Sequence, residues 1–367
     1  MKNIGVICYP TFGGSGIIAS ELGHGLSDQY KIHFIAYEKP VRLHLSNQNI
    51  FYHKVNIPHY PLFEYPPYEL ALTARIVEVV LAYNLDLLHV HYAIPHAYAA
   101  VNARKILLEN NIDIPIITTL HGTDITLIGK SPFVLSAVNY AINQSSLVTS
   151  VSENLKSETL KHFNIKHNIK VIPNFIRFKT EKPIQKLIKH KKTICHISNF
   201  RAVKRVLDVI SVFYNIQKVI DAELIMIGEG PDFKKAISLV SELGLDHVVK
   251  FVGKTKTIEK FLKESDLFLL PSESESFGLV ALEAMSFSIP VITTNSGGVT
   301  ELVLDNKNGY TCNVGDVDEM SKKAINLLSN QNLYLEYSDL AYKTAKKYDI
   351  DNIIPLYSEC YLQLLNR

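Results

Sequence analysis

Short apolar runs alternate with longer amphipathic stretches along the first half of the chain. The runs cover residues 4–8, 32–36, 87–91, 114–118 and 147–151, and polar or glycine-containing segments separate them. Runs of this length, joined by segments of helical periodicity, are typical of buried parallel strands connected by helices. The first half is therefore predicted to be a βα repeat built on a mostly parallel sheet.

A second series of the same kind follows a polar interval. The pattern stops near residue 173, and the lysine-rich stretch 178–192 is interpreted as an interdomain connection. Apolar runs then resume at 193–197, 222–227, 248–252, 267–270 and 290–294. Two such series predict an α/β fold with two Rossmann-like domains facing across a cleft, which the carboxyl ends of the strands would line.

The predicted domain boundaries follow from these two series. We place an N-terminal domain at 1–175 and a C-terminal domain at 176–349, and we expect a helix over about 350–367 to pack back on the first domain. The length of 367 residues agrees with two domains, because a single core rarely serves so long a chain.

Charge and cysteine content narrow the function classes. The net charge of +2, from 38 basic and 36 acidic residues, gives no general case for binding nucleic acid or an acidic membrane. Cys8, Cys195, Cys312 and Cys360 are scattered and lack the pairing of a zinc site, which favours a reducing cytoplasm. We see no apolar run long enough for a membrane span.

Two glutamates eight residues apart carry the strongest chemical signal. Glu275 and Glu283 follow the fourth apolar run of the second series, and the apolar spacing predicts a helix from Phe277 onward. Glu275 would then lie in a strand-to-helix loop and Glu283 about two turns into the helix. The N–H groups of Phe277, Gly278 and Leu279 would form a helix N-terminus that can bind a phosphate.

This arrangement predicts a nucleotide-sugar site, with carboxylates that accept hydrogen bonds from sugar hydroxyls. The plainer alternative is that acidic residues simply favour the first turn of a helix, whatever its function.

A glycine loop near the N-terminus supports a competing function. Gly14, Gly16 and Ala19 match the dinucleotide-binding pattern after a strand, and Glu38 follows the second strand. An NAD-dependent oxidoreductase is therefore an alternative, although the second domain carries its own phosphate-type loop. The same glycines would also let backbone amides approach any anion, whether a diphosphate or a carboxylate.

Segments across nearly the whole chain resemble glycosyltransferase family 4. In the C-terminal half they are 198–205 (Ser-Asn-Phe-Arg-Ala-Val-Lys-Arg), 228–231, 265–271, the Glu275 and Glu283 pair, and 296–301. In the N-terminal half, 9–16, 63–70, 89–96 and 118–126 resemble one subgroup, which transfers GlcNAc from UDP-GlcNAc to L-malate in the first step of bacillithiol biosynthesis.

The resemblance implies a retaining glycosyltransferase of the GT-B fold that needs no metal or other cofactor. Its small-molecule partners would be UDP-GlcNAc and L-malate, with no nucleic acid and no membrane, and a homo-oligomer is left open. Without a metal, cations and helix N-termini must neutralise the departing diphosphate. Arg201, Lys204 and Arg205 supply charge in one short loop, and which arginine contacts phosphate stays open.

The resemblance also implies roles for individual residues. Glu283 would accept the ribose hydroxyls, Glu275 the 3- and 4-hydroxyls of the transferred sugar, and His121 would reach its 6-hydroxyl. The implied catalytic set is Arg201, Lys204, Glu275 and His121, and the implied donor-binding set is Gly14, Arg205, Phe277, Gly278, Leu279 and Glu283.

Malate is a small dianion, so its pocket should contain hydrogen-bond donors in the N-terminal domain. The candidates are Ser15, Tyr92 and Thr119, with Arg42 as a cation. Another acceptor for the same chemistry, or a sugar-nucleotide sensor without catalysis, are the remaining alternatives.

Expectations for three other features complete the site, namely a group of histidines, Asp124 and Ser288. His89, His91 and His96 are not expected to bind metal, because strand and loop positions are mixed and no cysteine or carboxylate lies nearby. Asp124 is expected to stabilise a loop rather than to act as a nucleophile, so malate would attack from the face that the diphosphate leaves. Ser288 stands where the family normally has glycine after a helix, a departure that bears on the local cap.

Overall fold

The computed structural model describes residues 1–11, 13–57, 64–127, 129, 131–178 and 190–366. It divides into two compact units, one made of residues 1–177 with 350–367 and the other of residues 178–349. Most of the predicted connection over 178–192 lies outside the described residues.

The first unit is built on a parallel sheet of seven strands in the order β3-β2-β1-β4-β5-β6-β7. Its strands are β1 (Lys2–Ile7), β2 (Tyr30–Ala36), β3 (Ile50–Lys54), β4 (Leu87–His91), β5 (Ile116–Leu120), β6 (Leu147–Ser150) and β7 (Ile169–Val171). The strands β3 and β7 were not predicted. They lie at the two edges of the sheet, where a strand is partly exposed and its sequence shows no continuous apolar run.

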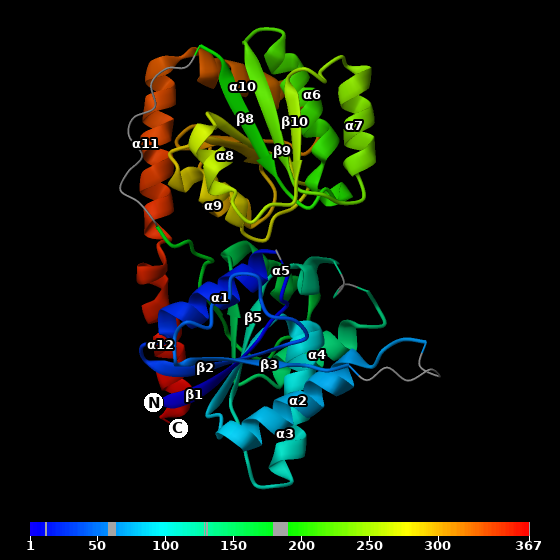
Figure 1. Ribbon diagram of the computed structural model, residues 1–367, viewed down its shortest axis with the longest axis vertical. Coiled ribbons are helices and arrows are strands. Elements are labelled where there is room, and N and C mark those ends of the chain that lie inside the picture. The colour runs from blue at the N-terminus through cyan, green and yellow to red at the C-terminus, as the bar shows by residue number, and fades with distance from the viewer. Residues whose placement is uncertain (12, 58–63, 128, 130, 179–189, 367) are drawn as a thin grey trace. The chain divides into compact units, whose positions relative to one another are not determined.

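Helices cover this first sheet, and one of them comes from the far end of the chain. They and the short helical turns are α1 (Gly14–Leu26), α2 (Tyr68–Tyr83), η1 (Ala93–Ala97), α3 (Tyr98–Leu108), η2 (Thr123–Leu127), α4 (Leu135–Asn143), α5 (Glu153–His162) and α12 (Ile350–Leu365). Figure 1 shows α12 beside α1. A side chain at Gly25 of α1 would overlap Ile354 of α12, so this glycine permits the close packing.

The second unit has a parallel sheet of six strands in the order β10-β9-β8-β11-β12-β13. The strands are β8 (Lys192–Ile197), β9 (Ala222–Ile227), β10 (Val249–Gly253), β11 (Leu267–Leu270), β12 (Val291–Thr294) and β13 (Gly309–Cys312). The edge strand β13 was not predicted. The helices and turns are η3 (Ala202–Lys204), α6 (Val206–Gln217), α7 (Phe233–Glu242), α8 (Glu259–Glu264), α9 (Leu279–Ser286), η4 (Gly298–Glu301), α10 (Val317–Ser329) and α11 (Gln331–Lys347).

The strand order in each sheet fixes where a site can form. It reverses between β1 and β4 in the first unit and between β8 and β11 in the second. At such a reversal the loops that follow the two strands run to opposite faces of the sheet, and parallel α/β proteins bind ligands there. The site residues predicted from the sequence lie mainly on these loops and on the neighbouring loop after β5.

Candidate active site

The loop after β11 carries Glu275 and leads into α9, which carries Glu283. The helix begins at Leu279, with Gly278 as its N-cap in the left-handed conformation at φ 86°. The predicted start at Phe277 was therefore wrong, since Gly278 reverses the chain before the helix begins. Glu283 lies about one turn into the helix rather than two. In the described structure the N–H groups of 277–279 donate to no other residue, so they remain available to an anion.

The first glutamate is fixed on both its main chain and its side chain. Its carbonyl accepts the N–H of Gly298 at 2.6 Å, and Gly297 lies so close to the backbone of Glu275 that a Cβ there would overlap it. The Oε1 atom of Glu275 accepts from Nζ of Lys204 at 2.6 Å and from Oγ of Ser272 at 2.7 Å. The structure thus brings together a predicted cation and a predicted sugar ligand.

The two arginines of the cation loop have different surroundings. Nε of Arg205 donates to Asp208 at 2.6 Å, and Nη1 donates to Glu273 at 3.4 Å. The hydrogen bond to Asp208 raises the pKa of Arg205. Arg201 is exposed, and it forms no ion pair with any residue that the structure describes. Its charge is therefore uncompensated, whereas that of Arg205 is already paired.

The predicted glycine loop forms the N-terminus of α1. The helix begins at Gly14, which is exposed, and Ser15 follows with 7% exposure. A Cβ at Gly16 would lie 2.5 Å from the carbonyl oxygen of Tyr9, so only glycine lets the helix start this close to the loop after β1. Gly14 and Ser15 therefore lie at the carboxyl end of the first sheet.

The predicted acceptor residues Arg42 and Tyr92 come from two other loops of the first unit. A guanidinium nitrogen of Arg42 lies 3.9 Å from Oε1 of Glu21, so its charge is partly balanced. Tyr92 directly follows β4 at φ 88°, a strained conformation for a residue other than glycine. Its ring meets that of Tyr9 edge-on, with centroids 5.4 Å apart.

His121 follows β5 and belongs to a buried group of histidines. Its Nε2 atom lies 2.9 Å from Nδ1 of His91, and His121 itself is 9% exposed. His96 donates from Nδ1 to the carbonyl of His91 at 2.6 Å. Burial lowers the pKa of His121 to about 3 and that of His96 to about 4, so both rings are neutral near pH 7. Among the described residues, no group of three histidine, cysteine or acidic side chains could hold a metal ion.

The burial of the Thr119 side chain argues against its predicted role in acceptor binding. The residue is 0% exposed, and its hydroxyl lies 2.7 Å from both Nε2 of His89 and Oγ1 of Thr149. His89 in turn contacts the hydroxyl of Tyr361 in α12 at 2.7 Å. The sequence pattern placed Thr119 correctly on a strand end but could not show that its side chain points into this buried network.

Asp124 ties two loops of the first unit together. Its Oδ2 accepts the N–H of Ala93 at 2.8 Å, and its Oδ1 accepts the N–H of Gly122 at 3.0 Å. The carboxyl group is 2% exposed, and burial raises its pKa to about 6. Both oxygens are engaged with backbone, which agrees with the expected loop-stabilising role.

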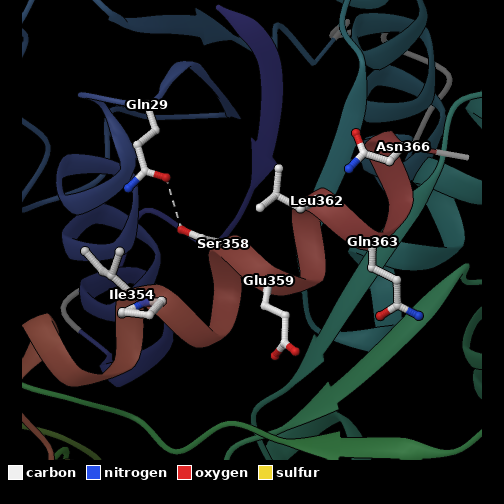
Figure 2. Close-up of a pocket in the computed structure, with 8 residues that line it drawn as sticks. Gln29, Ile354, Ser358, Glu359, Leu362, Gln363 and Asn366 are labelled. Carbon is white, nitrogen blue, oxygen red and sulfur yellow. Dashed lines mark hydrogen bonds between the residues drawn. The ribbon is translucent and has the colours of Figure 1, made fainter.

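A hollow of about 570 Å³ lies away from these residues, along α12. Figure 2 shows it lined by side chains such as Gln29, Ser358 and Leu362, with Ser358 bonded to Gln29. None of the predicted site residues lines it, so it is a surface feature separate from the candidate active site.

Comparisons with known proteins agree with this geometry. Residues 12–179 match the family described as Glycosyltransferase Family 4, and residues 177–344 match Glycosyl transferases group 1. N-acetyl-alpha-D-glucosaminyl L-malate synthase of Bacillus anthracis is 40% identical over 99% of this chain and 97% of its own. An uncharacterized glycosyltransferase of Methanocaldococcus jannaschii is 26% identical over 98% of this chain and 97% of its own.

Solved structures share the fold. Anabaena HepE in complex with UDP-glucose superimposes with a TM-score of 0.81 at 21% identity, covering 99% of this chain and 100% of that one. Sucrose-phosphate synthase from Thermosynechococcus elongatus gives a TM-score of 0.81 at 17% identity, with 100% of both chains covered.

These findings define the protein as a glycosyltransferase with the GT-B fold. The chain belongs to glycosyltransferase family 4. The predictions of fold, family and enzyme class are confirmed, and neither family match supports the alternative of an NAD-dependent oxidoreductase. Within the described part of the chain, no helix has the length and apolar character needed to cross a membrane.

Proposed function

We propose that this enzyme transfers GlcNAc from UDP-GlcNAc to the hydroxyl of L-malate and keeps the α configuration of the sugar. One observation carries the proposal, which is the 40% identity with the malate synthase of Bacillus anthracis over nearly all of both chains. The acceptor assignment depends on that relative's name, and the chemistry of the described side chains supports the rest.

The second unit would bind the nucleotide and the diphosphate. Free N–H groups at the start of α9 and the uncompensated charge of Arg201 suit a diphosphate, whose negative charge grows as the bond to the sugar breaks. Lys204, three residues after Arg201, would add its charge without giving up Glu275, because its ammonium has three N–H donors and the bond to Glu275 uses one. Glu275 keeps Oε2 available for the sugar hydroxyls, because its two described donors both contact Oε1. Glu283 is assigned to the ribose.

Of the two arginines, the existing bonds of Arg205 favour Arg201 as the phosphate ligand. Arg205 would have to give up two bonds, to Asp208 and Glu273, before it could contact a phosphate. Breaking charge-assisted hydrogen bonds costs free energy that Arg201 need not supply. Arg205 therefore holds the loop in shape, and Arg201 with Lys204 neutralises the leaving group.

The first unit would bind malate and position the sugar. Ser15 offers its N–H group at the start of α1, and Arg42 and Tyr92 offer a cation and a hydroxyl for a small dianion, while Gly14 stays assigned to the donor. His121 is assigned to the 6-hydroxyl of the sugar, and as a neutral ring it can donate or accept one hydrogen bond there.

The reaction would proceed by front-face attack without an enzyme base. The malate oxygen forms a bond to C1 of the sugar while the bond from C1 to the diphosphate oxygen breaks, and a phosphate oxygen takes the malate proton. A double displacement would need a free carboxylate as nucleophile. Asp124 does not fit that role, since both its oxygens accept backbone N–H groups. No metal is needed, because Arg201 and Lys204 supply the positive charge.

Product analysis tests the proposal. The purified enzyme is incubated with UDP-GlcNAc and L-malate, with parallel samples containing D-malate, glycerate or inositol and one L-malate sample containing EDTA. We expect repeated turnovers with L-malate, unaffected by EDTA, and a product with the mass of a GlcNAc–malate conjugate. Faster turnover with another acceptor would overturn the malate assignment, and UDP binding without any turnover would favour the non-catalytic sensor.

A further inference from the structure

His196 is a fully buried histidine at the strand-order reversal of the second unit. It lies near the end of β8, and the paired register of β8 with β11 ends one position earlier, at Cys195 and Phe268. Beyond that point the imidazole of His196 bonds to β11 instead, because its Nδ1 lies 2.8 Å from the carbonyl oxygen of Leu269. A side chain thus replaces the next bond between the two strands.

The hydrogen bonds of His196 fix which nitrogen carries the proton. A carbonyl oxygen can only accept, so Nδ1 must be the donor to Leu269. Burial lowers the pKa of His196 to about 4, which keeps the ring neutral and leaves Nε2 as an acceptor. Oγ of Ser198 lies 2.8 Å from Nε2 and must donate to it. The same oxygen then accepts the N–H of Phe200 at 3.3 Å.

The loop that this chain of bonds reaches is strained. Phe200 has φ 37°, a left-handed conformation that costs a residue other than glycine about 1 kcal/mol or more. The loop is also fitted tightly against the turn after β9, where side chains at Gly228 and Gly230 would overlap the carbonyl oxygens of 198 and 199. Contacts from outside the loop are therefore needed to hold its conformation. Arg201 is the residue that directly follows the strained Phe200.

We propose that His196 is a positioning residue of the nucleotide-sugar site. Through the hydroxyl of Ser198 it fixes the loop over 198–201, and it thereby presents Arg201 to the diphosphate of the sugar nucleotide. The proposal rests on the donor assignment made above. Every buried histidine needs partners for its ring nitrogens, and what distinguishes His196 is that one of its two partners belongs to the loop that carries Arg201.

Calorimetric titrations with UDP and with uridine test this role, because the two ligands differ only in the diphosphate. His196→Asn keeps a donor toward Leu269 but cannot reach Ser198, and Ser198→Ala removes the hydroxyl. We expect each variant to bind UDP about tenfold more weakly, as loss of one fixed charge contact would give, while uridine affinity is unchanged. The double variant should bind UDP about as weakly as either single variant, because both substitutions break the same chain.

Two matched variants make the test specific. Ser198→Thr keeps the hydroxyl and should restore most of the preference for UDP over uridine. His247→Asn changes an exposed histidine of the same unit and should leave both affinities at the wild-type level. Should His196→Asn fold poorly, as a melting temperature would reveal, Ser198→Ala and Ser198→Thr carry the same comparison at the loop.

The outcomes separate this inference from the proposed function. A wild-type enzyme that binds UDP no more tightly than uridine would overturn the donor assignment and this inference together. A wild-type preference for UDP that survives in both His196→Asn and Ser198→Ala would overturn the positioning role alone. So would equal losses of UDP and uridine affinity, which would indicate general damage to the unit.

Discussion

Nζ of Lys204 lies 2.6 Å from Oε1 of Glu275, and this ion pair joins the loops that follow β8 and β11. The two side chains are only 17% and 10% exposed, so water screens the pair weakly. The backbones meet at the same place, where the N–H of Glu273 donates to the carbonyl of Val203 at 2.8 Å. The cation is therefore already held in place before a diphosphate arrives.

Lys204→Ala should lower kcat far more than it raises the KM for malate. The charge on the departing diphosphate is greatest as its bond to the sugar breaks, so a cation beside it stabilises the transition state more than the bound substrate. We expect kcat to fall by about 100-fold or more, the scale seen when one preorganised electrostatic contact is removed. Steady-state kinetics with malate varied at saturating UDP-GlcNAc measures both constants.

Glu275 is the control for this prediction. Lys204→Ala leaves the Glu275 carboxylate without its cation, which could itself disturb the loop. The double variant Lys204→Ala with Glu275→Gln removes that uncompensated charge and should recover thermal stability, and this readout is the one compared because Glu275 itself binds the sugar. An unchanged kcat in Lys204→Ala would remove this lysine from the mechanism.

Glu283→Ala should weaken the binding of UDP. Its position about one turn into α9 places the carboxylate near the free N–H groups at the helix start, where the ribose would lie if the phosphates bind those groups. Loss of hydrogen bonds to a charged acceptor should reduce affinity by about 10- to 100-fold. Calorimetry gives the dissociation constant, with the exposed Glu242→Ala at the end of α7 as control. Equal UDP binding by wild type and Glu283→Ala would show that this glutamate does not contact the nucleotide.

Ser288→Gly should stabilise the enzyme. Ser288 follows α9 at φ 59°, where glycine carries no steric cost, and its hydroxyl is buried without a partner among the described residues. Removing both penalties should raise the free energy of unfolding of the second unit by about 1 kcal/mol. Urea titration measures the free energy of unfolding, and the urea midpoint should rise for Ser288→Gly. Ser286→Gly weakens the last turn of the same helix and should lower the midpoint. A lower midpoint for Ser288→Gly would contradict the argument.

Stability should fall as the pH decreases from about 6.5 to 4. Burial lowers the pKa of five histidines to about 3 or 4 in the folded protein, against 6.5 in the unfolded chain, and these are His33, His89, His96, His121 and His196. Between those values the unfolded chain binds protons that the folded protein does not. Each histidine therefore removes about 1.4 kcal/mol of stability per pH unit across the window.

Asp124 acts in the opposite direction over part of the same range. Burial raises its pKa to about 6, so from there down to 3.8 the folded protein holds one proton more than the unfolded chain. It offsets about one of the five histidines and leaves the net slope unchanged in sign. Melting temperatures recorded between pH 7.5 and 4.5 test the sum, and His33→Asn should flatten the curve. A melting temperature independent of pH would contradict the burial of these rings in their neutral form.

The sequence predicted the features that depend on chain periodicity and on short local motifs. The central strands and the glutamate loop are of this kind, because buried parallel strands read as continuous apolar runs. The sequence did not predict β3, β7 and β13, three of the four edge strands, although it predicted the fourth, β10, and it missed the start of α9, which the left-handed Gly278 delays. Contacts between distant residues were also missed. Thr119 and His196 look alike in sequence as polar residues near strand ends, and only their partners show where each points.

Asp124→Asn tests the stereochemical course of the reaction. Asn presents one oxygen and one NH₂ group where the carboxylate presents two acceptors, so one of the N–H groups of Ala93 and Gly122 loses its partner. We expect a loss of stability of about 1–3 kcal/mol, together with measurable turnover, because the loop is weakened but no nucleophile is lost. Proton NMR of the fresh product should show the anomeric coupling of an α linkage for both wild type and variant. A β-linked product would defeat front-face attack, and so would a glycosyl group trapped on Asp124 and found by mass spectrometry, since the wild-type carboxylate would then be the nucleophile of a double displacement.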